Sequence, residues 1–542
     1  MTVAADDRRL DVLVVGAGLS GLYLLWLLRR RGLAVEVVDK APSVGGTWWW
    51  NRYPGLRCDV ESMTFSYSWD ADLEQEWSWP ERYSKQSEIL RYLRHVAERH
   101  DLMRDIRLET EVTAAAWDPA DEAWHVETSR GPRSARFLVM ATGCLSVPNL
   151  VAFEGLGDFR GDWHHTAFWP EDGVDLTGQR VAVVGTGSSA IGAIPEIARQ
   201  AAHLTVFQRT ANFSIPAWNA PISPAQEADR KARYPETRAL ARTGATGDIW
   251  PLAPGKARDL TPEEREAELE RRWHQGSFSF LSAFADMTTD PEANRIAVDF
   301  VHRKIKAIVK DPATAELLCP KDHPLGTKRL CVDHGYYETF NRPNVDLVDV
   351  SAAPIERITA DGIVAHGTEH PVDVIVFATG FDGMTGALMA VDIEGRDGRR
   401  LRDEWAEGPH SYLGLMVHGY PNLFTLTGPG SPSVLANMMT TIEHHAELCD
   451  QAIGHCTDLG ATTLEPTAEA QAAWDEEVQR AAYATLYPQA ASWYMGANIP
   501  GKPRVFLPYI GGVGTYIRTC DAVVAEGWRG FELSGPPALQ RR

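Results

Sequence analysis

Two glycine-rich loops, each placed directly after a run of β-branched residues, constrain the fold of this chain more than any other feature. The first loop, G-A-G-L-S-G at 16–21, follows the apolar stretch 10–15 and precedes a helical pattern. The second loop, G-T-G-S-S-A at 185–190, follows the apolar stretch 179–184 and also precedes a helical pattern. A strand, such a loop and a helix together form a dinucleotide-binding unit. The sequence therefore predicts an α/β fold with two doubly wound, Rossmann-like dinucleotide-binding domains.

The chemistry of a pyrophosphate explains each glycine of the first loop. Gly16 permits the tight turn, Gly18 lets the pyrophosphate approach the backbone, and Gly21 lets the helix pack closely on the strand. About 20 residues further on, Asp39 ends the next predicted strand, where a carboxylate can accept hydrogen bonds from both ribose hydroxyls. We therefore expect Asp39, with its neighbour Lys40, to bind the first nucleotide.

The second loop differs at the ribose position. Arg209 follows closely after the predicted strand at 203–207, where a site for NAD would carry an acid. A guanidinium can hold a 2′-phosphate through paired, charge-assisted hydrogen bonds, so this site favours NADPH over NADH. The alternative is a solvated cation at a strand end. The other residues expected at this site are Gly185, Thr186, Gly187, Ser188, Ser189 and Thr210.

Composition excludes several classes of protein. The 542 residues carry 53 Lys and Arg against 73 Asp and Glu, a net charge of −20, which disfavours nucleic acid and anionic membranes as partners. Seven cysteines are scattered without a C-x-x-C pair, which argues against flavin disulfide reductases and indicates a reducing, cytoplasmic location. The polar start of the chain, 1–9, predicts no secretory signal. We expect a monomer without a metal ion.

Three further motifs resemble those of the Baeyer–Villiger monooxygenases. Residues 159–170 match F-x-G-x-x-x-H-x-x-x-W-P, and residues 46–59 match G-x-W-x-x-x-x-Y-P-G-x-x-x-D. A third motif, G-T-K-R, stands at 326–329. Without these motifs, the aromatic residues of 159–169 would be interpreted as a linker packed between domains. The fingerprint residues are Phe159, Gly161, His165, Trp169 and Pro170.

The resemblance implies a reaction and its cofactors. NADPH reduces bound FAD, O2 then gives a C4a-peroxyflavin, and this attacks a ketone to form a Criegee-type adduct that yields an ester or lactone, with sulfoxidation as a side activity. Arg329 would stabilise the peroxide and the adduct because its guanidinium is always charged, and Asp59 would orient it. The ketone, of aryl, cyclic or steroid-like kind, and O2 are the expected partners.

The resemblance also implies roles for individual residues. Lys328 would contact the 2′-phosphate, and Trp493 would hydrogen-bond the nicotinamide ribose. The ketone pocket would be lined by Ser433, Val434 and Leu435. The remaining flavin contacts would be Gly46, Thr47, Trp48, Asp59, Phe65, Val112 and Met438.

An A-T-G triplet ends two predicted strands, at 141–143 and 378–380, and suggests where the chain crosses between domains. We expect an FAD domain from 1–145 and 376–542, a linker at 146–175, and an NADP domain at 176–375 with a helical insertion at about 225–330.

Other interpretations stay open at this point. An N- or S-oxygenating flavin monooxygenase shares both nucleotide folds but lacks the Trp-Pro ending of the fingerprint. A non-catalytic FAD/NADPH sensor is a second alternative. Individually, Asp59 could be part of a surface ion pair, the 326–329 run a basic surface turn, and 428–438 a surface loop.

Overall fold

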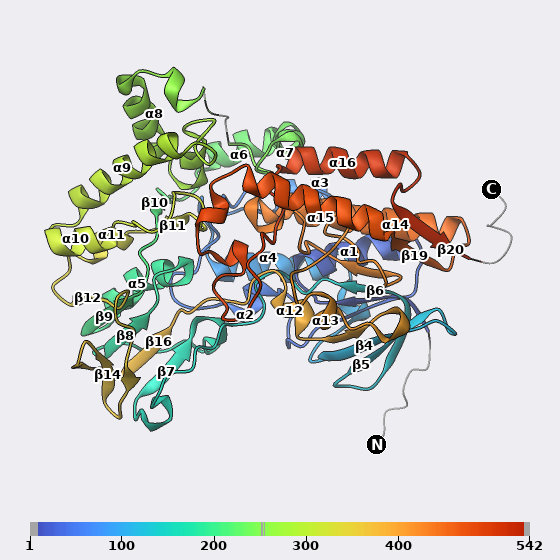
Figure 1. Cartoon of the computed structure of the whole chain (residues 1–542), viewed down its shortest axis with the longest axis horizontal. Coiled ribbons are helices and arrows are strands. Elements are labelled where there is room, and N and C mark those ends of the chain that lie inside the picture. Colours follow the sequence, from blue (N-terminus) through green and yellow to red (C-terminus); the bar gives the residue numbers. More distant parts are fainter. Residues whose placement is uncertain (1–8, 251–252, 254, 536–542) are drawn as a thin grey trace.

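Two parallel-rich sheets organise the chain, as a computed structural model describes it for residues 9–250, 253 and 255–535 (Figure 1). The first sheet has the strand order β17-β4-β5-β6-β1-β2-β3, with β18 also paired to β6. Its strands come from both ends of the described chain: β1 Leu10–Val15, β2 Val35–Val38, β3 Ile106–Arg107, β4 Val112–Asp118, β5 Ala123–Thr128, β6 Arg133–Met140, β17 Asp392–Glu394 and β18 Leu423–Thr425.

The second sheet has five strands in the order β12-β9-β8-β16-β7, all parallel. Its strands are β7 Asp162–His165, β8 Arg180–Val184, β9 His203–Gln208, β12 Val345–Asp349 and β16 Val374–Phe377. Both sheets have β-branched central strands that are almost fully buried, as a sheet covered on both faces requires. The predicted α/β class with two doubly wound units is confirmed.

Part of the segment expected to be a linker is an edge strand. Residues Asp162–His165 form β7 and pair with β16 in register, Trp163 opposite Ile375. The aromatic side chains of this stretch do not form one buried cluster, because Trp163 is 48% and Phe168 53% exposed while Trp169 is buried. A linker packed between domains would have buried all of them.

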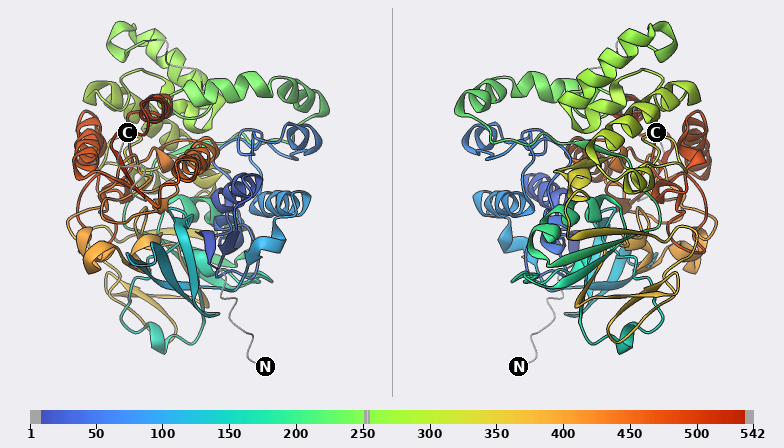
Figure 2. Two further views of the ribbon diagram at one scale, coloured as in Figure 1. Left: turned by 90° about the vertical axis from the view of Figure 1, so that its right-hand side faces the viewer. Right: turned by 90° about the vertical axis from the view of Figure 1, so that its left-hand side faces the viewer.

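Helices pack against the strands of both sheets. In the first unit, α1 Leu19–Arg30 follows the first glycine loop and packs against α14 Met438–Asp458. In the second unit, α5 Ser188–Gln200 follows the second loop. The expected helical insertion is present as α6 Pro224–Ala232, α7 Tyr234–Thr243, α8 Pro262–Gln275, α9 Pro291–Ile308 and α10 Pro312–Leu318. Figure 2 shows these helices gathered at one end of the molecule.

The insertion reaches back to the first unit. Arg238 of α7 donates to Glu74 of α3 (Ala71–Glu76) at 2.9 Å, and α7 packs on α16 (Val513–Ala525). All seven cysteines are free and buried. No helix among residues 9–250 and 255–535 combines the length and the apolar character needed to cross a bilayer. Residues 1–8, on which the expectation about a secretory signal depends, lie outside the described residues.

Candidate active site

One cavity of about 1360 Å³ lies between the two units, and both glycine loops open onto it. The carboxyl ends of β1 and β8 reach its wall through Val15 and Val184. This is the edge of a parallel sheet at which ligands bind in doubly wound folds.

The two glycine loops rest on the two A-T-G triplets in the same way. Gly16 has φ +114°, and a Cβ there would lie 2.4 Å from the carbonyl oxygen of Ala141. Gly185 also has φ +114°, and its Cβ would lie 2.6 Å from the carbonyl oxygen of Ala378. A side chain fits neither place, which explains why glycine begins each loop. Each loop therefore packs against the alanine carbonyl of one A-T-G triplet.

The first loop is shaped for close approach of a ligand to its backbone. A Cβ on Gly18 would lie 3.4 Å from Cα of Gly46, so the loop at 16–21 and the motif at 46–59 contact each other through glycines. A Cβ on Gly21 would lie 1.9 Å from the carbonyl oxygen of Gly16, which fits the close helix packing expected there. Gly21 itself faces the strand and does not line the cavity.

Asp39 has a second task that the sequence did not reveal. Its carboxylate accepts hydrogen bonds from the backbone N–H groups of Ala17, at 2.7 Å, and Ala41, at 2.8 Å. It therefore ties the first loop to the end of β2. Each carboxylate oxygen retains a lone pair, and Asp39 lines the cavity beside Lys40, so a ribose remains within its capacity.

The second loop presents an anion site. Thr186 donates through its hydroxyl to the carbonyl oxygen of Thr210 at 2.7 Å, which fixes the loop against the end of β9. A Cβ on Gly187 would meet nothing within 4 Å, so the backbone there faces open space. Arg209 and Thr210 line the cavity close by.

Two cations stand together at this end of the cavity. Burial lowers the pKa of Lys328, and the nearby positive charge of Arg209 lowers it further. Lys328 reaches one carboxylate, Asp322, at 3.8 Å. For Arg209 there is no ion pair with any described residue. Such a pair of weakly compensated cations favours a bound dianion.

Arg329 joins the two units at the centre of the site. Its Nε and Nη2 donate to one carboxylate oxygen of Asp59, at 3.0 and 2.8 Å, and its Nη1 donates to the carbonyl oxygen of Val434 at 2.6 Å. The guanidinium also lies 4.3 Å from the ring centre of Phe278, and the Tyr494 hydroxyl lies nearby. Burial alone would lower the pKa of Arg329, but the interactions with Asp59 and Tyr494 together outweigh burial and raise this pKa. The cation is thus fixed at the cavity wall.

The Y-P-G part of the 46–59 motif docks the first unit onto the second. Tyr53 packs in the hydrophobic core of the second unit, and burial raises its pKa to about 12. Gly55 has φ +79°, and a Cβ there would lie 2.0 Å from the carbonyl oxygen of Gly192 in α5. Sequence reasoning missed these contacts, although the motif itself was visible.

His165 of the fingerprint connects β7 to the second A-T-G triplet. Its Nδ1 accepts from the backbone N–H of Ala167 at 3.1 Å, so Nε2 carries the proton and donates to the Thr379 hydroxyl at 3.0 Å. Thr379 donates onward to the carbonyl oxygen of Asn149 at 2.6 Å. Burial lowers the pKa of His165 to about 4, which keeps the ring neutral. The fingerprint histidine therefore fixes a cavity-lining turn without lining the cavity itself.

Most of the predicted site residues line this one cavity. They are Gly16, Gly18, Asp39, Lys40, Gly46, Thr47, Trp48, Asp59, Phe65, Val112, Gly185, Thr186, Gly187, Ser188, Ser189, Arg209, Thr210, Lys328, Arg329, Val434, Met438 and Trp493. The cavity lining does not include the following predicted residues: Gly21, Phe159, Gly161, His165, Trp169, Pro170, Ser433 and Leu435.

Of the expected ketone-pocket residues, only Val434 faces the cavity. Ser433 is fully buried with φ +36°, and its hydroxyl lies 3.0 Å from the Cys144 thiol. Sequence reasoning missed the residues Tyr494 and Phe278, which contact Arg329 from segments distant in the chain.

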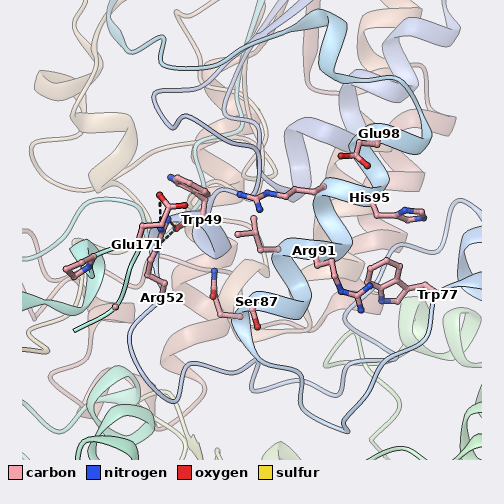
Figure 3. A pocket seen from close by; sticks show the side chains of 13 residues that line it. Trp49, Arg52, Trp77, Ser87, Arg91, His95, Glu98 and Glu171 are labelled. Carbon is pink, nitrogen blue, oxygen red and sulfur yellow. Dashed lines mark hydrogen bonds and ion pairs between the residues drawn. The ribbon is translucent and has the colours of Figure 1, made fainter. Parts of the chain in front are cut away.

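A second cavity of about 720 Å³ runs along α4 (Gln86–Arg99), and Trp49 and Pro170 are among the residues that line it. Figure 3 shows the side chains around it. Its arginines are already engaged with the protein. Arg52 lies over Trp49, pairing with Glu171 at 3.5 Å, and Arg91 lies over Trp77. Because these arginines already have partners within the protein, the second cavity offers few free cations to a ligand.

One cluster among the described residues has the composition of a cation site. Asp118, Asp121 and His125 lie close together on the β4–β5 hairpin. Asp121 and His125 are exposed, and no other observation points to a metal there.

Comparison with known proteins gives close relatives along the whole chain. The family model of pyridine nucleotide-disulphide oxidoreductases matches residues 13–234. Acetone monooxygenase (methyl acetate-forming) of Gordonia sp. (strain TY-5) is 43% identical, over 97% of this chain and 99% of that protein. Cyclohexanone 1,2-monooxygenase of Acinetobacter sp. is 41% identical, over 96% of each chain. The solved structure of an oxidized steroid monooxygenase bound to NADP is 51% identical, with a TM-score of 0.94 over 98% of this chain and 100% of that one.

Proposed function

The chain belongs to the Baeyer–Villiger monooxygenases, and we propose that it uses NADPH and O2 to convert ketones into esters or lactones with a bound FAD. The observation that carries this proposal is the position of Arg329. It comes from the second unit, is held by Asp59 from the first, and stands at the wall of a cavity shared by two nucleotide loops.

The residues of the first loop fit FAD. The missing Cβ atoms of Gly16 and Gly18 leave the backbone accessible, and the N-terminus of α1 offers unpaired N–H groups to a pyrophosphate. Asp39 stands where it can accept from a ribose. When bound there, FAD supplies the two-electron chemistry that links NADPH, O2 and the ketone.

The residues of the second loop fit NADPH. The N-terminus of α5 begins at Ser188, next to the open backbone of Gly187, and can hold the pyrophosphate. Arg209 and Lys328 supply two cations for the 2′-phosphate, and among the described residues no Asp or Glu lines the cavity beside Arg209. We therefore propose selectivity for NADPH over NADH.

Arg329 is the catalytic residue in this proposal. Oxygen insertion next to a carbonyl generates negative charge, first on the attacking oxygen and then on the former carbonyl oxygen. A fixed guanidinium stabilises both, and it cannot act as a proton donor that would quench the nucleophile. Asp59 positions the guanidinium through two hydrogen bonds and so keeps the charge at the cavity wall.

We also propose a substrate class and a cellular setting. We propose aryl, cyclic or steroid-like ketones, with sulfoxidation as a side reaction, on the strength of the relatives' names and of Val434 beside Arg329. We propose a monomer in the cytoplasm, and the seven buried free thiols support the reducing location. We also propose the domain limits near 145, 175 and 375; the division of the strands between two sheets supports those near 145 and 375, and places β7 of the expected linker in the second sheet.

A ketone panel tests the function. Purified FAD-loaded enzyme should oxidise NADPH faster when acetophenone, cyclohexanone or a 20-ketosteroid is added, and one ester or lactone should form per NADPH consumed. Amines and sulfides serve as the second arm. Faster turnover with amines or sulfides than with every ketone would favour the N- or S-oxygenating alternative. A sample that binds FAD and NADPH but never turns over would favour the sensor.

A further inference from the structure

The segment that carries Trp493 is fastened to the turn following β16 by contacts from three side chains. Trp493 and Asn498 line the cavity, as does Phe381 in the turn. Lys502, at the far end of the same segment, donates to the carboxylate of Asp382 and to the carbonyl oxygen of Gly383, the latter at 2.8 Å. Both ends of the segment are therefore held on residues 381–383.

The other two contacts are geometrically strict. Asn498 donates through Nδ2 to the carbonyl oxygen of Phe381 at 2.7 Å. The ring of Trp493 lies directly on Gly383, because a Cβ there would be 2.7 Å from Cε3 of the indole. Any residue larger than glycine at 383 would push the indole away from the turn.

The ion pair is well shielded from water. The side chain of Lys502 is 11% exposed and that of Asp382 27%. A shielded pair is weakened less by solvent and salt than a surface pair, and an unpaired Lys502 would have to leave its site. This ion pair therefore contributes more to holding the segment on the turn than a typical surface ion pair would.

We propose that Lys502 and Asp382 are positioning residues that hold Trp493 over the bound nucleotide and thereby set how long NADP⁺ stays in the cavity. This inference rests on the proposed function. Nucleotide that leaves early uncouples the reaction: NADPH, one proton and O2 then give NADP⁺ and H2O2, and no oxygen atom reaches the ketone.

The test uses the FAD-loaded full chain and NADP⁺ as the probe. Lys502→Met and Asp382→Asn should each raise the NADP⁺ dissociation constant, followed by flavin absorbance, about tenfold, which corresponds to one lost hydrogen-bonded charge pair. Lys502→Arg keeps the charge and should stay within about threefold of the parent protein. The yield of ester per NADPH should fall in the first two variants, while flavin reduction at saturating NADPH should change less than twofold.

Lys306→Gln is the matched control. It removes a lysine from an ion pair with Glu316 that is exposed and lies on α9, so NADP⁺ affinity should not change. Gly383→Ala displaces the indole without altering any charge and should weaken NADP⁺ binding as Lys502→Met does. It also supplies the measurement if Lys502→Met does not fold.

Three results would count against the proposal in different ways. Parental NADP⁺ affinity and ester yield in Lys502→Met overturn it. Parental NADP⁺ affinity in Gly383→Ala overturns it as well, because the position of Trp493 on Gly383 would then have no effect on NADP⁺ binding. A parent protein that binds no NADP⁺ at all would instead refute the proposed function.

Discussion

Removing Asp59 tests whether Arg329 works only where the first unit holds it. In Asp59→Ala, Arg329 loses the two hydrogen bonds to one carboxylate oxygen, at 3.0 and 2.8 Å. It keeps the carbonyl of Val434 and the ring of Phe278. The guanidinium therefore stays in the cavity, but its direction is no longer fixed by a carboxylate.

The size of the effect follows from these contacts. A hydrogen bond to a charged group contributes about 1.5–3 kcal/mol net, and the two bonds share one acceptor oxygen, so we take about 3 kcal/mol for both together. Each ~1.4 kcal/mol of lost transition-state stabilisation is a factor of ten in rate. Ester formation should fall about 100-fold in Asp59→Ala and about tenfold in Asp59→Asn, because the amide oxygen still accepts without the charge.

The assay measures ester formation and flavin reduction separately. Rapid mixing with NADPH under anaerobic conditions gives the reduction rate, which should fall much less than ester formation. In an Arg329→Ala background the Asp59→Ala change should have almost no further effect, since the two residues act as one unit. Ester formation at the parental rate in Asp59→Ala, or fully additive losses in the double variant, would refute this account.

Three other outcomes are expected. Arg209→Ala should raise the KM for NADPH about 100-fold and leave that for NADH nearly unchanged, in steady-state kinetics; equal effects on both would contradict a 2′-phosphate contact. Gly55→Ala, with φ +79° and a Cβ 2.0 Å from the Gly192 carbonyl oxygen, should destabilise the fold by at least about 2 kcal/mol and lower Tm by several degrees; an unchanged melting curve would show that the docking is loose. The pKa of His165 is about 4 in the folded state and about 6.5 when unfolded, so its contribution to stability is complete above pH 6.5 and is lost as pH falls towards 4, by up to about 3 kcal/mol. Urea unfolding at pH 7.5 and 5 should show this loss in the parent and less of it in His165→Asn; equal losses would assign the effect to other groups.

Local patterns predicted the parts of this site that depend on neighbouring residues. The strand, loop and helix at each of 10–30 and 180–200 are visible in the sequence because glycine spacing and apolar periodicity are local properties. The edge strand β7 was not predicted. Its partner β16 lies about 200 residues away in the sequence, and its own residues do not alternate regularly between apolar and polar. Pairing over such a separation leaves no local signal.

The centre of the site shows the same limit. The roles of Asp59 and Arg329 came from resemblance to a family. Val434, in contrast, accepts a hydrogen bond from Arg329 through its backbone carbonyl, which any residue type could supply, so its identity in the sequence gives no sign of this contact. The contact between Gly55 and Gly192 is similar, because a glycine needed for close approach cannot be distinguished in sequence from a glycine needed for a turn.

The late pairing of β18 with β6 has a consequence for biosynthesis. Leu423 lies opposite Leu138, so the first sheet gains this strand only after nearly 300 further residues have left the ribosome. Until then the edge of β6 that receives β18 stays open, and an open edge is a template for wrong strand pairing. Contacts of such long sequence separation also slow folding. Slow production at low temperature should therefore increase the yield of correctly folded enzyme, more than it would for a protein whose sheets are each built from one continuous segment.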